Sequence, residues 1–289
     1  MTRRRLDREL VRRGLAASAE EAAELVAAGR VTVGGAPAVT VTRQVDGAEA
    51  VAVRAGEPAF VTRSGAKLAG ALDAFGLDPS GRRCLDAGAS GGGFTDCLLQ
   101  RGAAAVTAVD VGYGLLHDRI RRDPRVTVVE RTNVRRLQAG DLGLPFDAVV
   151  ADLSFISLRT VAPNLLGQAR PGASLVLLVK PQFEATREEA DAGAGVITDR
   201  AVHARVLGEV ITALGDAGAE PVGLAPSVLT GGGGNLEYVL HARRTPSPDP
   251  GPDPGPETRV DAGELIARAV AAGARPGDPN GGGATHDRP

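Results

Sequence analysis

Two lysines and two acids are the residues of this chain whose types and positions point most directly to chemistry. Among the 33 Lys and Arg residues of the 289-residue chain, the lysines are Lys67 and Lys180, and all the others are Arg. Arginine replaces lysine readily on a solvated surface, but a guanidinium does not release its proton in a protein, whereas an amine can. We therefore interpret the two lysines as kept where a deprotonatable amine is needed. Chance survival under a strong Arg bias is the alternative.

The elements around these lysines predict that they meet two acids at one edge of a sheet. Asp152 and Lys180 each end an apolar run of the buried parallel-strand type, and ligands of such sheets bind beyond the carboxyl ends of the strands. Glu237 stands near the beginning of the last run, which reaches the same edge if that strand is antiparallel. Lys67 lies in a predicted helix from about residue 62 to 75, before the first strand. We expect all four charged groups to converge in one crevice.

The pattern of apolar runs predicts the fold. Runs suited to strands alternate with helical stretches, which favours a doubly wound α/β domain with helices on both faces of a seven-stranded, mostly parallel sheet. The predicted strands are residues 82–88, 104–110, 125–130, 146–152, 173–180, 221–225 and 235–242.

A glycine-rich loop after the first predicted strand indicates a cofactor site. In "LDAGASGGGFTD" (85–96), the glycines allow a tight turn and a close approach of the backbone to a ligand at a helix start. Ser90 takes the place of the second glycine of a dinucleotide fingerprint, so a nicotinamide dinucleotide is the weaker interpretation. Asp110 ends the next strand, where an acid accepts hydrogen bonds from a ribose diol, the usual layout for S-adenosylmethionine. A structural turn that serves another ligand is the alternative.

Asn133, just past the third strand, is a weaker candidate for the adenine or its ribose, since Asn is also ordinary turn chemistry. The predicted cofactor-binding residues are Gly88, Ala89, Ser90, Gly91, Gly92, Gly93, Phe94, Asp110, Val111, Asn133 and Asp152.

The first 56 residues predict a small α+β module. Leu6 and Leu10 mark one helix, and Ser18 followed by Glu21 is a capping box that opens a second. Short strands are expected around Val31–Val33 and Val39, across a Gly-Gly turn. The segment "RLDRELVRRGLAASAEEAAELVAAGRVTVGG" resembles the S-four-like RNA-binding domain, which implies phosphate recognition by guanidinium groups. A helical cap with merely solvated arginines is the alternative. The predicted RNA-binding residues are Arg3, Arg4, Arg5, Arg12, Arg13, Arg30 and Arg63.

Composition sets the remaining bounds. The net charge of −2 combines a basic head with an acidic tail, and the basic head suggests an anionic partner such as nucleic acid. Cys84 and Cys97 show no metal spacing and no disulfide framework, so we expect no metal site and a reducing cytoplasm. No apolar run suits a signal peptide or a membrane span. The expected organisation is a module at 1–56, a linker at 57–61, an α/β domain at 62–244, and a Pro/Gly-rich, largely disordered tail at 245–289 with one short helix near 261–272.

The whole stretch from Arg4 to about Arg243 resembles a known family. Lys67, Asp152, Lys180 and Glu237 look like the K-D-K-E tetrad of FtsJ-like ribose 2′-O-methyltransferases. Together with the N-terminal module, "RRCLDAGASGGGFTD", "DVGYG", "VVERTN", "VVADLSFISL", "LVKPQFE" and "GNLEYVL" are similar to the TlyA, or hemolysin A, proteins. The resemblance implies a Rossmann-like class I methyltransferase fold and S-adenosylmethionine as cofactor. It also implies 2′-O-methylation of cytidine in the ribosomal RNA of the small subunit, often of both subunits, by a cytoplasmic monomer that acts on a ribosomal subunit or ribosome.

Chemistry accounts for these residue types. A ribose hydroxyl is a poor nucleophile near neutral pH, so a base and an in-line methyl donor are needed. Under the resemblance, Lys180 is the base or orients the hydroxyl, Asp152 orients its amine, and Lys67 positions the substrate.

Three departures from the family pattern stand out. Relatives more often have Thr at Gly91, they have Arg, Ala and Trp in the linker where this chain reads "PAFV" (58–61), and the "TGGGGN" loop before Glu237 is unusually Gly-rich, which predicts mobility. The alternatives for function are a base N-methyltransferase, a membrane-active hemolysin-like protein and a non-catalytic RNA-binding assembly factor. "DLSF" (152–155) lacks the prolines of an amino-methylating motif, and no amphipathic insertion segment is evident.

Overall fold

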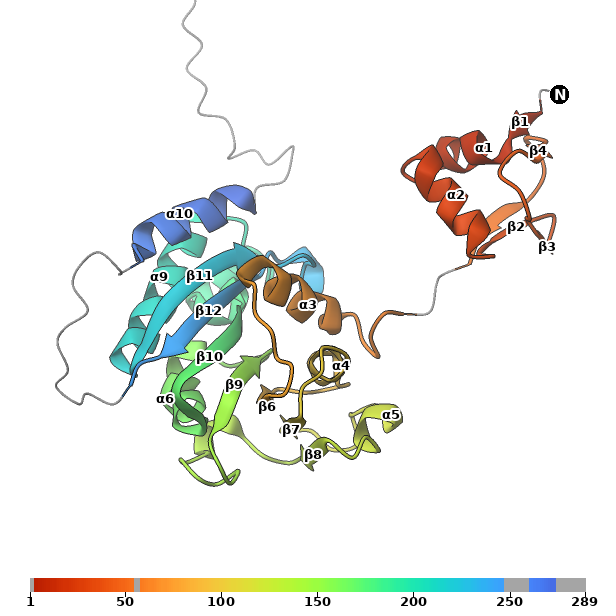
Figure 1. Cartoon of the computed structure of the whole chain (residues 1–289). Coiled ribbons are helices and arrows are strands. Elements are labelled where there is room, and N and C mark those ends of the chain that lie inside the picture. Colours follow the sequence, from red (N-terminus) through yellow and green to blue (C-terminus); the bar gives the residue numbers. More distant parts are fainter. Residues whose placement is uncertain (1–2, 55–57, 247–259, 274–289) are drawn as a thin grey trace, which may run out of the picture. The chain divides into compact units, whose positions relative to one another are not determined.

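The computed structural model describes residues 3–54, 58–246 and 260–273, and it divides the chain into two compact units (Figure 1). The first unit ends at Pro58 and the second begins at Ala59. Most of the predicted Pro/Gly-rich tail lies outside the described residues, so its predicted disorder stays a prediction. The short helix expected within that tail is present as α10 (Ala262–Ala272).

The first unit is a small α+β domain with its own core. Its elements are β1 (Arg4–Arg5), α1 (Leu6–Arg12), α2 (Ala19–Ala27), β2 (Val31–Val33), β3 (Ala36–Pro37), β4 (Gln44–Val45) and β5 (Val51–Val53). The predicted apolar faces of both helices and of β2 are buried together, with Leu6, Leu10, Ala22, Val31 and Val33 almost fully enclosed.

Two local predictions in this unit need correction. The Ser18 side chain caps α2 by accepting from the Glu21 N–H, but the Glu21 carboxylate accepts from the Ala17 N–H at 2.6 Å, so the reciprocal half of the box closes one residue earlier. Val39 is not in a strand and is 93% exposed, because the strand after the Gly-Gly turn already ends at Pro37.

The second unit contains the predicted seven-stranded sheet, in the order β11-β12-β10-β9-β6-β7-β8. Every neighbouring pair is parallel except the two that involve β12, which runs antiparallel to β10 and to β11. The strands are β6 (Arg83–Ala87), β7 (Ala105–Val109), β8 (Val126–Val129), β9 (Phe146–Ala151), β10 (Ala169–Val179), β11 (Ala219–Pro226) and β12 (Tyr238–Arg244).

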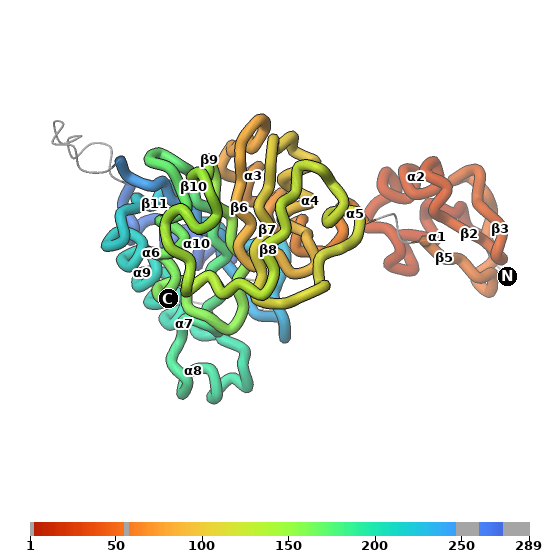
Figure 2. The backbone as a smooth tube through the Cα atoms, turned by 90° about the horizontal axis from the view of Figure 1, so that it is seen from below, coloured from red at the N-terminus to blue at the C-terminus, as the bar shows by residue number. Residues whose placement is uncertain are grey.

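Helices cover both faces of this sheet, each over its own apolar core. On one face α3 (Ser64–Phe75) and α4 (Gly93–Gln100) bury Leu68, Leu72, Phe94 and Leu98. On the other face lie α6 (Leu158–Gln168), α9 (Arg200–Asp216) and α10 (Figures 1 and 2). The connections also contain α5 (Asp118–Arg121), α7 (Pro181–Glu184), α8 (Arg187–Ala192) and the 3₁₀ turns η1 (Val134–Arg136) and η2 (Gly232–Gly234).

This architecture confirms the predicted fold class, a domain with a seven-stranded, mostly parallel α/β sheet that follows a small α+β module along the chain. Parallel strands that are apolar on both faces need helices on both sides, and the strand-like runs of the sequence met that condition. Within the described part of the chain, no helix has both the length and the apolar character of a bilayer span.

Candidate active site

The strand topology brings the predicted charged residues to one edge of the sheet. Asp152 directly follows β9 and Lys180 directly follows β10, and these two strands are parallel neighbours. Val179 of β10 pairs with Tyr238 of β12, so the next residues outward, Lys180 and Glu237, reach the same edge from opposite chain directions. The antiparallel last strand therefore places Glu237 where the sequence required it.

The four side chains form two ion pairs with little exposure to solvent. Lys180 Nζ lies 2.6 Å from Asp152 Oδ1 and donates a hydrogen bond to Ser154 Oγ at 3.0 Å. The Lys180–Asp152 contact is ionic, since its angle does not suit a hydrogen bond and Oδ1 has no other partner in the described structure. Lys67 Nζ donates to Glu237 Oε2 at 2.5 Å. Lys67, Lys180 and Glu237 are 5%, 8% and 2% exposed.

Such burial distinguishes these pairs from surface ion pairs. Moving an ion from water into a protein interior costs several kcal/mol. Loss of one partner of a buried pair destabilises the fold by about 3–5 kcal/mol, because the other charge stays buried without compensation. Buried ionisable groups cost folding stability, and they are typical of functional sites, where their charge or proton is needed.

Two cavities meet at the Asp152–Lys180 pair. Gly88, Ser90, Asp152 and Ser154 line both of them. The first cavity extends along the strand tips past Asp110, Val111, Thr132, Asn133, Val134, Arg135, Leu153, Phe155 and Ile156. The second extends toward the start of α3 and is completed by Thr62, Arg63, Ser64, Ala89, Gly91, Phe94 and Lys180. Asp152 therefore lines both cavities, and its ion-pair partner Lys180 lines the second.

Two predicted cofactor glycines line neither cavity. A Cβ on Gly92 would lie 2.9 Å from Leu116 Cδ1, and a Cβ on Gly93 would lie 2.2 Å from both the Thr62 and the Ser64 hydroxyl oxygens. These glycines therefore serve close packing at the start of α4, and their predicted contact with a cofactor stays a prediction.

Gly88 is the glycine whose backbone the site requires. Its φ of +87° lies in the left-handed region, and a Cβ there would lie 2.7 Å from the Asp152 carbonyl oxygen. Gly88 thus allows the glycine loop and the Asp152 backbone to approach each other between the two cavities.

The structure gives a physical reason for the departure at Gly91. A Cβ at this position would lie 2.6 Å from Thr62 Cγ2, so the Thr62 methyl group already occupies the space that a larger residue at 91 would need. The two positions are therefore linked sterically, and the loop is packed here by Thr62 from the segment before α3.

Asp110 is held by backbone donors at the rim of the first cavity. Its Oδ2 accepts from the Ser90 N–H at 2.8 Å and its Oδ1 from the Gly112 N–H at 2.6 Å. Each carboxylate oxygen has a second lone pair, so the acid can still accept from a ligand. Asn133 also lines this cavity, but its side-chain oxygen accepts from the Arg135 N–H at 3.0 Å, which is the turn chemistry of the alternative interpretation.

The loop before Glu237 is hydrogen-bonded at several points. Gly231 donates to the Asn235 carbonyl at 2.8 Å, and the Asn235 amide group contacts the Gly195 carbonyl and the Ile197 N–H. A Cβ on Gly231 would lie 2.1 Å from Glu237 Oε1, so this glycine is needed for Glu237 to fit beneath the loop. The predicted mobility of the loop stays a prediction.

Sequence reasoning missed two polar residues of the site. Ser154, which contacts the Lys180 amine, could have been found two positions after Asp152. Asp86 is fully buried below the glycine loop, where its Oδ2 accepts from Thr95 Oγ1 at 2.6 Å and its Oδ1 has no partner in the described structure. Burial raises the pKa of Asp86 to about 7, and the nearby Asp152 adds to that shift. The acid of the "LDAG" motif was the available signal.

The predicted RNA-binding arginines differ in their surroundings. Arg12 and Arg13 both bind Glu9, which is 1% exposed, and they hold the pKa of that carboxyl down at about 2. Arg5 pairs with Asp7, and Arg30 donates to the Arg54 carbonyl. These arginines stabilise the first unit as well as presenting charge.

The other predicted RNA-binding arginines have fewer contacts with protein groups. Arg3 and Arg4 are exposed and have no side-chain partner in residues 3–54, 58–246 and 260–273. Arg63 lines the second cavity, beside the tetrad. In the same described ranges, no cluster of His, Cys, Asp and Glu is suited to hold a metal ion.

Comparisons with known proteins agree with this geometry. The family model for FtsJ-like methyltransferases matches residues 60–244, and the model for the S4 domain matches residues 4–47. The chain is 51% identical to the 16S/23S rRNA (cytidine-2′-O)-methyltransferase TlyA of Mycobacterium tuberculosis, over 83% of this chain and 90% of that protein. It is 34% identical to hemolysin A of Brachyspira hyodysenteriae, over 82% and 98% of the two chains. A solved structure of a putative hemolysin from Streptococcus thermophilus matches with a TM-score of 0.67 and 34% identity, over 93% and 96%.

Proposed function

This chain belongs to the family of FtsJ-like methyltransferases, and we propose that it transfers a methyl group from S-adenosylmethionine to the ribose 2′-hydroxyl of a cytidine in ribosomal RNA. The observation that carries the proposal is the Lys180–Asp152 pair at the junction of two cavities, with the Lys67–Glu237 pair at the same sheet edge. The S4 domain match and the printed activity of the Mycobacterium tuberculosis relative support RNA as the substrate.

The first cavity fits the cofactor. The carboxylate of Asp110 retains lone pairs for a ribose diol, and Gly88 lets the glycine loop and the Asp152 backbone come close together beside this cavity. When bound, S-adenosylmethionine supplies an electrophilic methyl group on a sulfonium. The residues of the predicted set that line this cavity, and that we assign to the cofactor, are Gly88, Ser90, Asp110, Val111, Asn133 and Asp152. Ala89, Gly91 and Phe94 line the second cavity, and Gly92 and Gly93 shape the loop by close packing.

The second cavity fits the ribose. Lys180 lines it and is fixed by Asp152 and Ser154, so its neutral amine would accept the proton of a 2′-hydroxyl while the oxygen bonds to the methyl carbon and the carbon–sulfur bond breaks, which would leave the cofactor as a neutral thioether. The proton then leaves Lys180 for solvent. Lys67 is held by Glu237 at the same sheet edge, and we assign it to positioning of the substrate, although neither residue lines the two cavities. Arg63 gives the same cavity a guanidinium for a phosphate.

Ribose-methylation mapping tests this proposal directly. Ribosomal subunits and intact ribosomes from cells without the protein are incubated with purified protein and S-adenosylmethionine. We expect a 2′-O-methyl group on cytidine at a fixed position. Methylation of a base would contradict the proposal and favour a base N-methyltransferase. No methylation of any of these substrates would contradict it and favour a non-catalytic assembly factor. The hemolysin-like alternative predicts lysis of red cells, which the same preparation can be assayed for.

The first unit is proposed to bind the RNA backbone. A protein that lacks residues 1–56 should still bind S-adenosylmethionine but should lose RNA affinity, with a smaller dependence of log K on log salt. A variant with Arg3→Ala and Arg4→Ala should lose part of that salt dependence, since these side chains are free to contact phosphate. Equal affinities and salt slopes for the full-length and truncated proteins would refute this role. We also propose that the protein acts as a cytoplasmic monomer, which sedimentation and cell fractionation test.

A further inference from the structure

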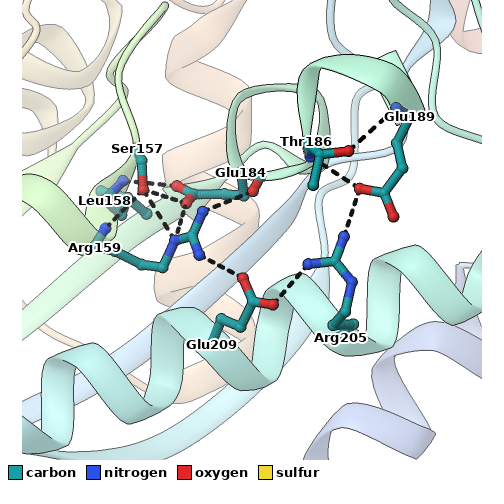
Figure 3. A network of polar contacts seen from close by, with 8 residues as sticks. All are labelled: Ser157, Leu158, Arg159, Glu184, Thr186, Glu189, Arg205 and Glu209. Carbon is teal, nitrogen blue, oxygen red and sulfur yellow. Dashed lines mark hydrogen bonds and ion pairs between the residues drawn. The ribbon is translucent and has the colours of Figure 1, made fainter. Parts of the chain in front are cut away.

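The loop after β9 and the loop after β10 are joined by a buried carboxylate that the proposed mechanism does not use. Glu184, four residues beyond Lys180, is 2% exposed. Its Oε2 accepts from Ser157 Oγ at 2.5 Å, and its Oε1 accepts from the Leu158 N–H at 2.6 Å (Figure 3). Both donors stand at the start of α6, a few residues beyond Asp152. The carboxylate therefore connects the segments that carry the acid and the lysine of the proposed site.

Arg159 adds a second link between the same two segments. Its Nε lies 3.2 Å from Glu184 Oε2 and its Nη2 donates to the Glu184 carbonyl at 2.8 Å. The guanidinium continues to Glu209 on α9, which also binds Arg205 (Figure 3). Burial raises the pKa of the Glu184 carboxyl, and the donors around it act in the opposite direction. A group that costs this much to bury is retained here with every carboxylate oxygen occupied.

The other contacts between the two loops are less suited to hold them together during turnover. The hydrogen bond from Lys180 to Ser154 involves the amine that must turn to a substrate hydroxyl. The Lys180–Asp152 ion pair involves the same amine. Phe155 also contacts Phe183 in a tilted arrangement with ring centroids 5.0 Å apart, and Phe155 is 90% exposed with a φ of +60°. The Glu184 contacts are buried and contain no atom that the proposed reaction needs.

We propose that Glu184 is a positioning residue for methyl transfer, which sets the separation of Asp152 and Lys180 by holding the loop after β9 against the loop after β10. The inference rests on the proposed function. It concerns the geometry of the reacting groups and not their chemistry, so Glu184 acts through Lys180 and Asp152 without touching a substrate. In-line transfer is sensitive to such placement, since a shift of about 1 Å can cost on the order of 100-fold in rate.

The substitution Glu184→Gln tests this inference with little change in volume. The amide group keeps one acceptor oxygen, and its two N–H donors face either the Leu158 N–H or the Arg159 Nε–H, neither of which can accept, so one of these two donors loses its acceptor. Glu209→Gln is the matched control, because it makes the same chemical change in the same network, where Glu209 binds the far side of Arg159 and contacts neither loop after β9 and β10. Steady-state methyl transfer at varied RNA concentration and calorimetric binding of S-adenosylmethionine are measured for the full-length proteins.

We expect Glu184→Gln to lower kcat by at least about tenfold while KM for RNA and Kd for the cofactor stay within about threefold. Glu209→Gln should keep kcat within about threefold. The calorimetric stoichiometry gives the folded fraction, so a purely structural defect would reduce the stoichiometry and leave kcat per folded site unchanged. Ser157→Ala should lower kcat less, and the Ser157→Ala/Glu184→Gln double variant should be no worse than Glu184→Gln alone, because both remove one interaction.

Several outcomes would overturn the inference. A kcat per folded site within about threefold of wild type in Glu184→Gln, or an equal loss in Glu209→Gln, excludes a positioning role. If Glu184→Gln binds no cofactor because it does not fold, Ser157→Ala decides, and an unchanged kcat there refutes the role. Failure of the proposed function is a different result, in which the wild-type protein itself transfers no methyl to RNA, and the positioning role then falls with it.

Discussion

Replacement of Lys180 with Arg keeps a positive charge beside Asp152 and removes a group that can accept a proton. In the structure Lys180 Nζ lies 2.6 Å from Asp152 Oδ1 and 3.0 Å from Ser154 Oγ, with 8% of the residue exposed. A guanidinium can bind the same carboxylate through two N–H groups, so Asp152 stays paired and the cavity that both residues line keeps its charge balance. The change therefore separates proton acceptance from electrostatics.

The expected magnitude follows from these contacts. A positioned acid–base group contributes on the order of 10²–10⁴ in rate, which corresponds to about 3–5 kcal/mol of barrier. Arg is longer than Lys, and in a site with so little free surface its guanidinium also takes space from the hydroxyl. We expect kcat to fall at least about 100-fold in Lys180→Arg. Affinity for S-adenosylmethionine should stay within about threefold, since Asp110 and the glycine loop are untouched.

The assay is steady-state transfer of a tritiated methyl group to ribosomal RNA at saturating cofactor, with cofactor affinity measured by calorimetry. Lys67→Arg is the matched control, because it makes the same substitution at the other buried lysine, whose partner is Glu237. We expect a smaller loss of kcat there, since Lys67 is assigned to positioning. A Lys180→Arg protein that transfers methyl within about tenfold of wild type would refute proton acceptance by this amine. A smaller kcat in Lys67→Arg than in Lys180→Arg would reverse the two assignments.

Three further substitutions test the physics of the site. Lys67→Met leaves Glu237 buried without its 2.5 Å partner, so the free energy of unfolding should fall by about 3–5 kcal/mol. The double variant Lys67→Met/Glu237→Gln should recover part of that loss. Denaturant titrations in which the single variant is as stable as wild type would contradict this. Gly91→Thr places a Cβ 2.6 Å from Thr62 Cγ2 and should weaken cofactor binding in calorimetry, because the glycine loop has to shift. The double variant Thr62→Ala/Gly91→Thr should recover the affinity. Equal affinities for the single and the double variant would disprove the steric link. Asp86 has its pKa raised by burial from 3.8 to about 7, so the folded state keeps this proton between those values and stability should decline as pH rises from about 4 to about 7. Asp86→Asn should flatten that decline in thermal melts, and parallel pH curves for both proteins would show that Asp86 does not cause it.

Local patterns in the sequence were sufficient for the architecture. Apolar runs that end in Asp110, Asp152 and Lys180 became parallel strands of one sheet, because a strand that is apolar on both faces has to lie inside a sheet covered by helices. Their carboxyl ends therefore had to share an edge. The scarcity of lysine added an independent signal, and both lysines are buried in ion pairs at that edge.

Predictions failed or fell short where the outcome depended on contacts between distant segments. Gly92 and Gly93 belong to a cofactor motif, yet Leu116 and the Thr62–Ser64 segment determine that they pack and do not line a cavity. Glu21 found a different backbone donor than the capping pattern predicts, since several N–H groups compete at a helix start.

What the sequence determined by itself was the class of fold, the set of charged residues and the edge at which they meet, since periodicity and strand order encode these. Only the tertiary structure decided the pairing within that set, Lys180 with Asp152 and Lys67 with Glu237, because the pairs join elements that are up to 170 residues apart. It also revealed Glu184, whose role depends on a carboxylate after one strand meeting the start of a helix after another. Burial and partner choice arise when remote elements pack together, and no local spacing specifies them.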